Sequence, residues 1–93
     1  MKILLTGWTY MDFPAKDDPT KRIQGYNLYL ANEVKDVNGF VPVSNEGKRF
    51  LSKTLADRFG ISQTFLAEHE LSLLDIEVDF NGKIIDIKEY TGD

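Results

Sequence analysis

Apolar and polar positions at the start of the chain predict a long β-strand followed by a polar loop. Residues 2–13 mix β-branched and aromatic residues without a helical period, which is typical of a strand. Gly7 interrupts this run, and glycine inside a strand indicates a bulge or bend that lets one strand serve two faces of a curved sheet. The polar segment 15–21 then predicts a charged loop.

Residues 22–33 predict a second strand, so the two strands form a long hairpin with the charged loop at its tip. Tyr26 shares its parity with Leu28 and Leu30 and is expected to point inward. Tyr29 has the opposite parity and is expected to be exposed.

A short third strand is predicted over residues 40–43, and Pro42 confines it to a sheet edge because proline cannot donate to a ladder. A helix is expected next, capped by Ser44 or Asn45 and ending near Phe59. Four apolar residues at helical spacing and a following glycine support this helix: Phe50, Leu51, Leu55, Phe59 and Gly60.

The last third predicts a short second helix after Ser62 and then a hairpin. Residues 74–80 alternate between apolar and acidic positions, and Asn81-Gly82 predicts a type I′ turn. Counting outward from this turn pairs Val78 with Ile85, Ile76 with Ile87, Asp75 with Lys88, and Glu77 with Asp86.

Five strands with a helix between the third and fourth is the element order of an OB-fold, a small partly open Greek-key barrel. We therefore predict an α+β, mostly β class and one domain spanning residues 1–93. The expected architecture is a five-stranded OB-like barrel with one helix, or two, between strands 3 and 4.

Composition limits the class of protein. The chain is 42% apolar and 28% charged, and it has no cysteine, which excludes disulfides and thiol chemistry. No apolar run approaches the length of a membrane span. These features predict a cytoplasmic protein without membrane association.

Charge is unevenly distributed within a net charge of −4. Residues 1–66 hold nine basic and seven acidic residues, whereas residues 67–93 hold two basic and eight acidic ones. Acidity therefore does not exclude a nucleic-acid ligand, but it keeps such a ligand away from the last third.

Candidate catalytic groups are sparse. His69 is the single histidine, and no nucleophile elbow or phosphate-binding loop is present. Asp75, Glu77 and Asp79 share one strand face, which a solvated surface explains more simply than a metal site. We expect no enzymatic activity, no cofactor and no metal.

Aromatic residues concentrate in the first hairpin, which holds five of the eleven in the chain: Trp8, Tyr10, Phe13, Tyr26 and Tyr29. Lys16, Lys21 and Arg22 lie at its tip. Aromatic rings beside cations are the means by which proteins bind single-stranded nucleic acid. Several of these rings can equally belong to the core, and the glycine at position 7 leaves the facing of Trp8 and Tyr10 open.

Three segments together resemble the small OB-fold single-stranded-DNA-binding proteins of phages and mobile elements: residues 7–13, 21–29 and 39–41. The resemblance implies a non-enzymatic single-stranded-DNA-binding protein, often a homodimer, whose first hairpin contacts the DNA. It implies stacking by Tyr10, Tyr26 and Tyr29, with Trp8 beside them. It also implies phosphate contacts from Lys16, Lys21, Arg22, Lys48 and Arg49.

Two alternatives remain. Residues 55–69 are similar to a helix-turn-helix, with Ala56 permitting close helix approach and Gly60 at the turn. However, the second helix has two acidic residues and no lysine or arginine, so it would repel DNA phosphates. The acidic face of Asp75, Glu77 and Asp79 is the other alternative, as a docking surface for a basic protein partner or a mimic of DNA.

Overall fold

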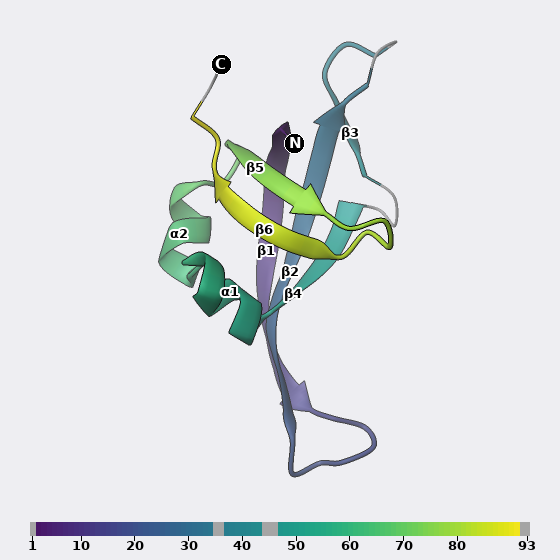
Figure 1. The fold of residues 1–93 in the computed structure, drawn as a ribbon, viewed down its shortest axis with the longest axis vertical. Coiled ribbons are helices and arrows are strands. Elements are labelled where there is room, and N and C mark those ends of the chain that lie inside the picture. The colour runs from purple at the N-terminus through teal and green to yellow at the C-terminus, as the bar shows by residue number, and fades with distance from the viewer. Residues whose placement is uncertain (1, 35–36, 44–46, 92–93) are drawn as a thin grey trace.

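The computed structural model describes residues 2–34, 37–43 and 47–91 (Figure 1). It confirms a mostly β chain of the α+β class, and the described residues form six strands in one antiparallel sheet and two short helices. The elements are β1 (Lys2–Pro14), β2 (Arg22–Glu33), β3 (Phe40–Pro42), β4 (Lys48–Ser52), α1 (Lys53–Phe59), α2 (Gln63–Glu68), β5 (Leu73–Val78) and β6 (Ile84–Glu89).

β2 organises the sheet, whose order is β3-β2-β1-β5-β6. One edge of β2 pairs with β1, and its other edge is shared by β4 along residues 25–29 and by β3 along residues 31–33. β1 pairs with β5 through residues 2–4, and Leu5 exchanges backbone hydrogen bonds with Leu71 and Ser72 just before β5. The β5–β6 hairpin therefore crosses the N-terminal half of the long hairpin, whose tip projects far from the rest of the molecule (Figure 1).

The bulge predicted near Gly7 is confirmed. The β1–β2 register shifts between Leu5 and Gly7, and the Thr6 hydroxyl donates to the Tyr29 carbonyl oxygen at 3.0 Å. After the shift, even-numbered rather than odd-numbered residues of β1 face the core. Leu5 and Trp8 therefore both face the core although they are three residues apart.

The core is one cluster built from β1, β2, β4, the β5–β6 hairpin and the two helices. Each helix contributes one fully buried residue, Ala56 from α1 and Leu66 from α2. The largest fully buried side chains are aliphatic: Leu5, Leu28, Leu51, Leu66, Leu74, Ile76, Ile84 and Ile87.

The helix predicted to begin at Ser44 or Asn45 is wrong in its first part. Residues 48–52 form β4 instead, because they satisfy the open edge of β2, and α1 begins at Lys53 with Ser52 as its N-cap. The candidate caps at 44 and 45 fall outside the described residues. The predicted end at Phe59 is confirmed, and so is the second helix capped by Ser62.

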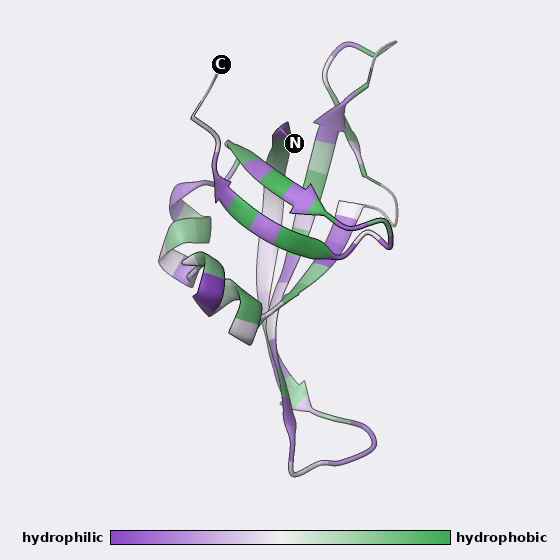
Figure 2. Ribbon diagram, viewed as in Figure 1, coloured by the Kyte–Doolittle hydropathy of each residue, from purple (hydrophilic) through white to green (hydrophobic). Residues whose placement is uncertain are grey.

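The β5–β6 hairpin confirms three of the four predicted pairs, and its apolar and polar residues alternate visibly in Figure 2. The fourth pair is wrong, because Val78 pairs with Ile84 rather than Ile85. The turn is longer than two residues, since Asp79 Oδ1 accepts from the backbone N–H groups of Asn81 and Lys83.

The strand count also differs from the predicted five. In the part of the chain that the structure describes, no ladder joins β6 to β3 or β4, so the sheet is open. None of the described helices combines the length and the apolar character that a membrane crossing needs.

Candidate nucleic-acid interface

The outer face of the β1–β2–β4 sheet, the side turned away from the core, presents a strip of apolar and aromatic residues. Cross-strand partners share a face, so the register defines four successive rows on it. From the hairpin tip upward the rows are Phe13–Ile23, Met11–Gly25–Ser52, Thr9–Asn27–Phe50 and Gly7–Tyr29–Lys48.

A shallow groove of about 310 Å³ runs along this outer face. Phe13 and Phe50, on the two strands that flank β2, are 41% and 47% exposed, which is unusual for large apolar side chains on one sheet face. The groove is lined by Met11, Phe13, Ile23, Asn27, Lys48 and Phe50.

Because Gly25 has no side chain, the Phe50 ring can lie across the backbone at this position. A Cβ atom at position 25 would lie 2.7 Å from Cζ of Phe50 and would also overlap the Leu51 carbonyl oxygen. The absence of a side chain at Gly25 therefore fixes the position of the most exposed ring on the outer face.

None of the four rows of the outer face contains an acidic residue, although Asp57 of α1 lines an adjoining hollow with Ile23, Phe50 and Ser52. Lys48 is exposed at one end, and no carboxylate of the described residues lies within ion-pair distance of it. Lys16 and Lys21 are exposed in the loop at the other end. The described acidic residues of the last third lie on α2, its C-terminal turn, β5, β6 and the turn that joins these strands, so charge is segregated in space as well as in sequence.

Trp8 and Tyr10, two of the predicted binding residues, lie on the opposite face. The Trp8 indole is half-buried against the core and donates to Glu70 Oε1 at 3.0 Å. Tyr10 packs at 5.4 Å from the ring of Tyr26, whose phenol has its pKa raised first by burial and then by the nearby Tyr10 and Asp57. Both rings therefore contribute to packing on the core side.

Arg22 and Arg49 also turn away from the groove. Arg22 Nε donates to Asp12 Oδ1 at 2.9 Å, and hydrogen bonds from Arg22 and Gln24 hold the pKa of the Asp12 carboxyl below its ordinary value. Arg49 faces the core side opposite Leu28, and its Nη1 donates to the Lys48 carbonyl oxygen at 2.8 Å.

The structure thus brings together only part of the predicted site. Tyr29 and Lys48 share the outer face, and Lys16 and Lys21 lie at the hairpin tip. Sequence reasoning missed the groove residues Met11, Phe13, Ile23, Asn27 and Phe50 as site residues. The parity of Tyr29 was the signal for those on β2, whereas Phe50 was hidden by its assignment to a helix.

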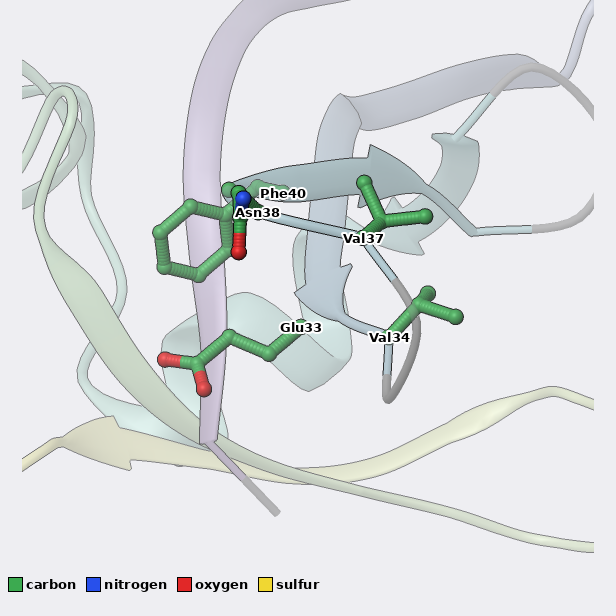
Figure 3. Close-up of a pocket in the computed structure, with 6 residues that line it drawn as sticks. Glu33, Val34, Val37, Asn38 and Phe40 are labelled. Carbon is green, nitrogen blue, oxygen red and sulfur yellow. The ribbon is translucent and has the colours of Figure 1, made fainter.

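A second hollow, of about 650 Å³, lies in the β2–β3 loop (Figure 3). Glu33 and Phe40 project to one side of this loop, and Val34 and Val37 to the other. Glu33 forms an ion pair with Lys2 at 3.2 Å. Because the described lining residues include a carboxylate and no cation, this hollow suits phosphate less well than the outer face does.

The predicted acidic face is divided by the fold. Asp75 lies opposite Lys88 with 3.9 Å between their charged groups, and Glu77 lies opposite Asp86. Asp79 belongs to the turn rather than to the strand. Among the residues described, no three acidic or histidine side chains converge as metal ligands would.

In the helix-turn-helix segment, Ala56 is buried and Gly60 has the left-handed conformation, as the sequence predicts. The second helix, α2, is six residues long and exposes Gln63, Thr64, Ala67 and Glu68. His69 ends α2, where its ring stacks on Phe65 at 4.0 Å and its Nδ1 lies 2.7 Å from the Phe65 carbonyl oxygen.

No protein-family model matches this chain, and no curated protein and no solved structure matches it significantly. The geometry of the described residues is therefore the basis for a functional assignment. Its main feature is an apolar groove between cations, in rows of residues that hold no carboxylate.

Proposed function

We propose that this chain binds single-stranded nucleic acid, DNA in particular, on the outer face of the β1–β2–β4 sheet and has no enzymatic activity. The observation that carries the proposal is the exposed aromatic groove, which has lysines at both ends and no carboxylate in its rows. Binding of a strand requires both rings and cations along one path.

The rings meet the first requirement. Stacking of a base on an aromatic ring is worth about 1–3 kcal/mol and tolerates any sequence, because every base has a flat face. Phe13, Phe50 and Tyr29 are spread over four rows, which at about 3.3 Å per strand residue span roughly 20 Å. This length fits a short site of a few nucleotides.

The lysines meet the second requirement. Lys48 at the upper end and Lys16 and Lys21 at the tip are placed to contact phosphates along the same path. For a single strand each such contact lowers the slope of log affinity against log salt by about 0.7. Three contacts therefore predict a slope of about −2.

The strand pairing supports an OB-like arrangement as the frame for this interface. β1 pairs with both β2 and β5, the helices precede β5, and β3 and β4 together occupy the second edge of β2. In OB-folds the face of strands 2 and 3 and the loops joining strands 1–2 and 4–5 bind oligonucleotides. The counterparts here are the β2–β4 face, the loop with Lys16 and Lys21, and the turn with Lys83.

Anisotropy titration of a fluorescein-labelled oligo-dT at two salt concentrations tests this function. Phe50→Ala should weaken binding by about 5- to 150-fold, the range that corresponds to one stacked base. Phe40→Ala is the matched control, because Phe40 is 39% exposed on β3 and does not line the groove. An affinity that is unchanged by salt and by Phe50→Ala would contradict the proposal.

Self-association is the second candidate function. Contiguous exposed apolar side chains on a monomer are typical of protein interfaces, and two copies meeting through Phe13, Ile23 and Phe50 would form a homodimer. Sedimentation velocity with and without oligo-dT separates the two functions. A dimer that dissociates with Phe50→Ala and has no affinity for the oligonucleotide favours self-association.

A further inference from the structure

Among the described residues, Asn27 is the one buried polar residue, at 8% exposed. It lies in the centre of the outer face, opposite Thr9 on one side and Phe50 on the other. No hydrogen bond joins its side chain to another described residue. The donor and acceptor of this amide therefore stay available to a ligand.

The amide of Asn27 opens toward the groove. No side-chain nitrogen or oxygen in the described residues is both fully enclosed and unpaired, so the Asn27 amide keeps a small accessible area. Asn27 also lines the groove, together with apolar walls from Met11, Phe13, Ile23 and Phe50. The groove thus combines an aromatic wall with a donor and an acceptor at its floor.

We propose that this groove is a nucleobase subsite in which the Asn27 amide binds the edge of one base while Phe50 contacts its flat face. The inference rests on the proposed binding of single-stranded nucleic acid. Stacking alone would bind any nucleotide sequence, whereas the Asn27 amide would make binding selective for one base. Lys48, at the rim, is placed to meet the phosphate of the same nucleotide.

Adenine is the base that this amide suits best. The side-chain oxygen of asparagine accepts from the exocyclic amine of adenine while its NH₂ group donates to the adjacent ring nitrogen. A purine that lacks the exocyclic amine retains the flat face but leaves the Asn27 oxygen without a donor. The subsite should therefore distinguish these two bases, although they stack alike.

The test compares two octanucleotides, one of deoxyadenosine and one of deoxynebularine, which is deoxyadenosine without its exocyclic amine. Wild-type protein should bind the deoxyadenosine strand at least fivefold more tightly. Asn27→Leu, which keeps the number and branching of the side-chain heavy atoms and removes the amide, should abolish this ratio, whereas Asn38→Leu in the exposed β2–β3 loop should leave it unchanged. The ¹⁵N resonance of the Asn27 side-chain amide in wild-type protein should shift on addition of the deoxyadenosine strand.

The outcomes separate the two proposals. If both octanucleotides bind with equal affinity and the Asn27 amide signal does not move, the subsite is refuted and strand binding stands. If neither octanucleotide nor oligo-dT binds, the function itself is refuted and the subsite with it. Because the resonance is followed in wild-type protein, the result does not depend on the folding of Asn27→Leu.

Discussion

The ring of Phe50 lies over Gly25, its diagonal neighbour across the β2–β4 ladder, so closely that a Cβ atom at Gly25 would come within 2.7 Å of Phe50 Cζ. This relationship leaves a large apolar ring exposed on the side of the sheet that faces away from the core. The groove, the proposed stacking surface and the environment of Asn27 all depend on it.

Gly25→Ala should destabilise the fold by about 1–3 kcal/mol, because the added methyl group overlaps the Leu51 carbonyl oxygen and displaces the Phe50 ring. Urea denaturation measures the change. Gly7→Ala is the matched control on the same face, since its methyl group would meet only Tyr29 Cδ2 at 4.0 Å. Equal losses for the two variants would contradict the packing described for Phe50.

Ser52→Ala should lower the free energy of unfolding by about 1 kcal/mol, because the Ser52 hydroxyl accepts from the Leu55 N–H at the start of α1. Thr54→Ala, at an exposed position of the same turn, serves as the control and should change stability less. Thermal unfolding followed by circular dichroism compares them. A larger effect at Thr54 than at Ser52 would argue against a helix that begins at Lys53.

The ion pair between Asp12 and Arg22 should show in the titration of Asp12. Its pKa lies below the ordinary value because the folded state favours the carboxylate. The pair therefore stabilises the fold at pH values above the ordinary pKa of the carboxyl. This contribution is lost as the pH falls through the lowered pKa. Arg22→Gln should raise the pKa of Asp12 toward its ordinary value in a ¹³C NMR titration, and an unchanged midpoint would show that the pair is absent in solution.

Local sequence patterns were sufficient for the long strands and their facing. β2 spans the predicted residues, and the buried Tyr26 and outward-facing Tyr29 follow from simple alternation. The bulge at Gly7 could also be predicted, but the face to which it turns Trp8 could not. That effect depends on which side of the sheet receives the helices, and no local pattern states this.

The start of α1 illustrates why the rest was not predictable. Phe50, Leu51 and Leu55 fit a helical face, and they fit equally well a strand that ends where a helix begins. The choice between these is made by the open edge of β2, a long-range partner that binds residues 48–52. Because Phe50 was assigned to a helix, the most exposed ring of the groove was not recognised as part of a binding face.

Trp8 offers a direct control for the location of the ligand, since its indole lies on the core side and is held by Glu70. Strand binding on the outer face should leave Trp8 emission nearly unchanged in the wild-type protein. In the double variant Trp8→Phe/Phe50→Trp, the only indole lies in the groove and should be quenched.

Tryptophan fluorescence during oligo-dT titration of these two proteins therefore tests the central claim most directly. The account predicts strong, saturable quenching in Trp8→Phe/Phe50→Trp, with a midpoint that rises with salt, and little change in the wild type. Strong quenching of Trp8 in the wild type with none in the double variant would place the ligand on the opposite face and contradict the account.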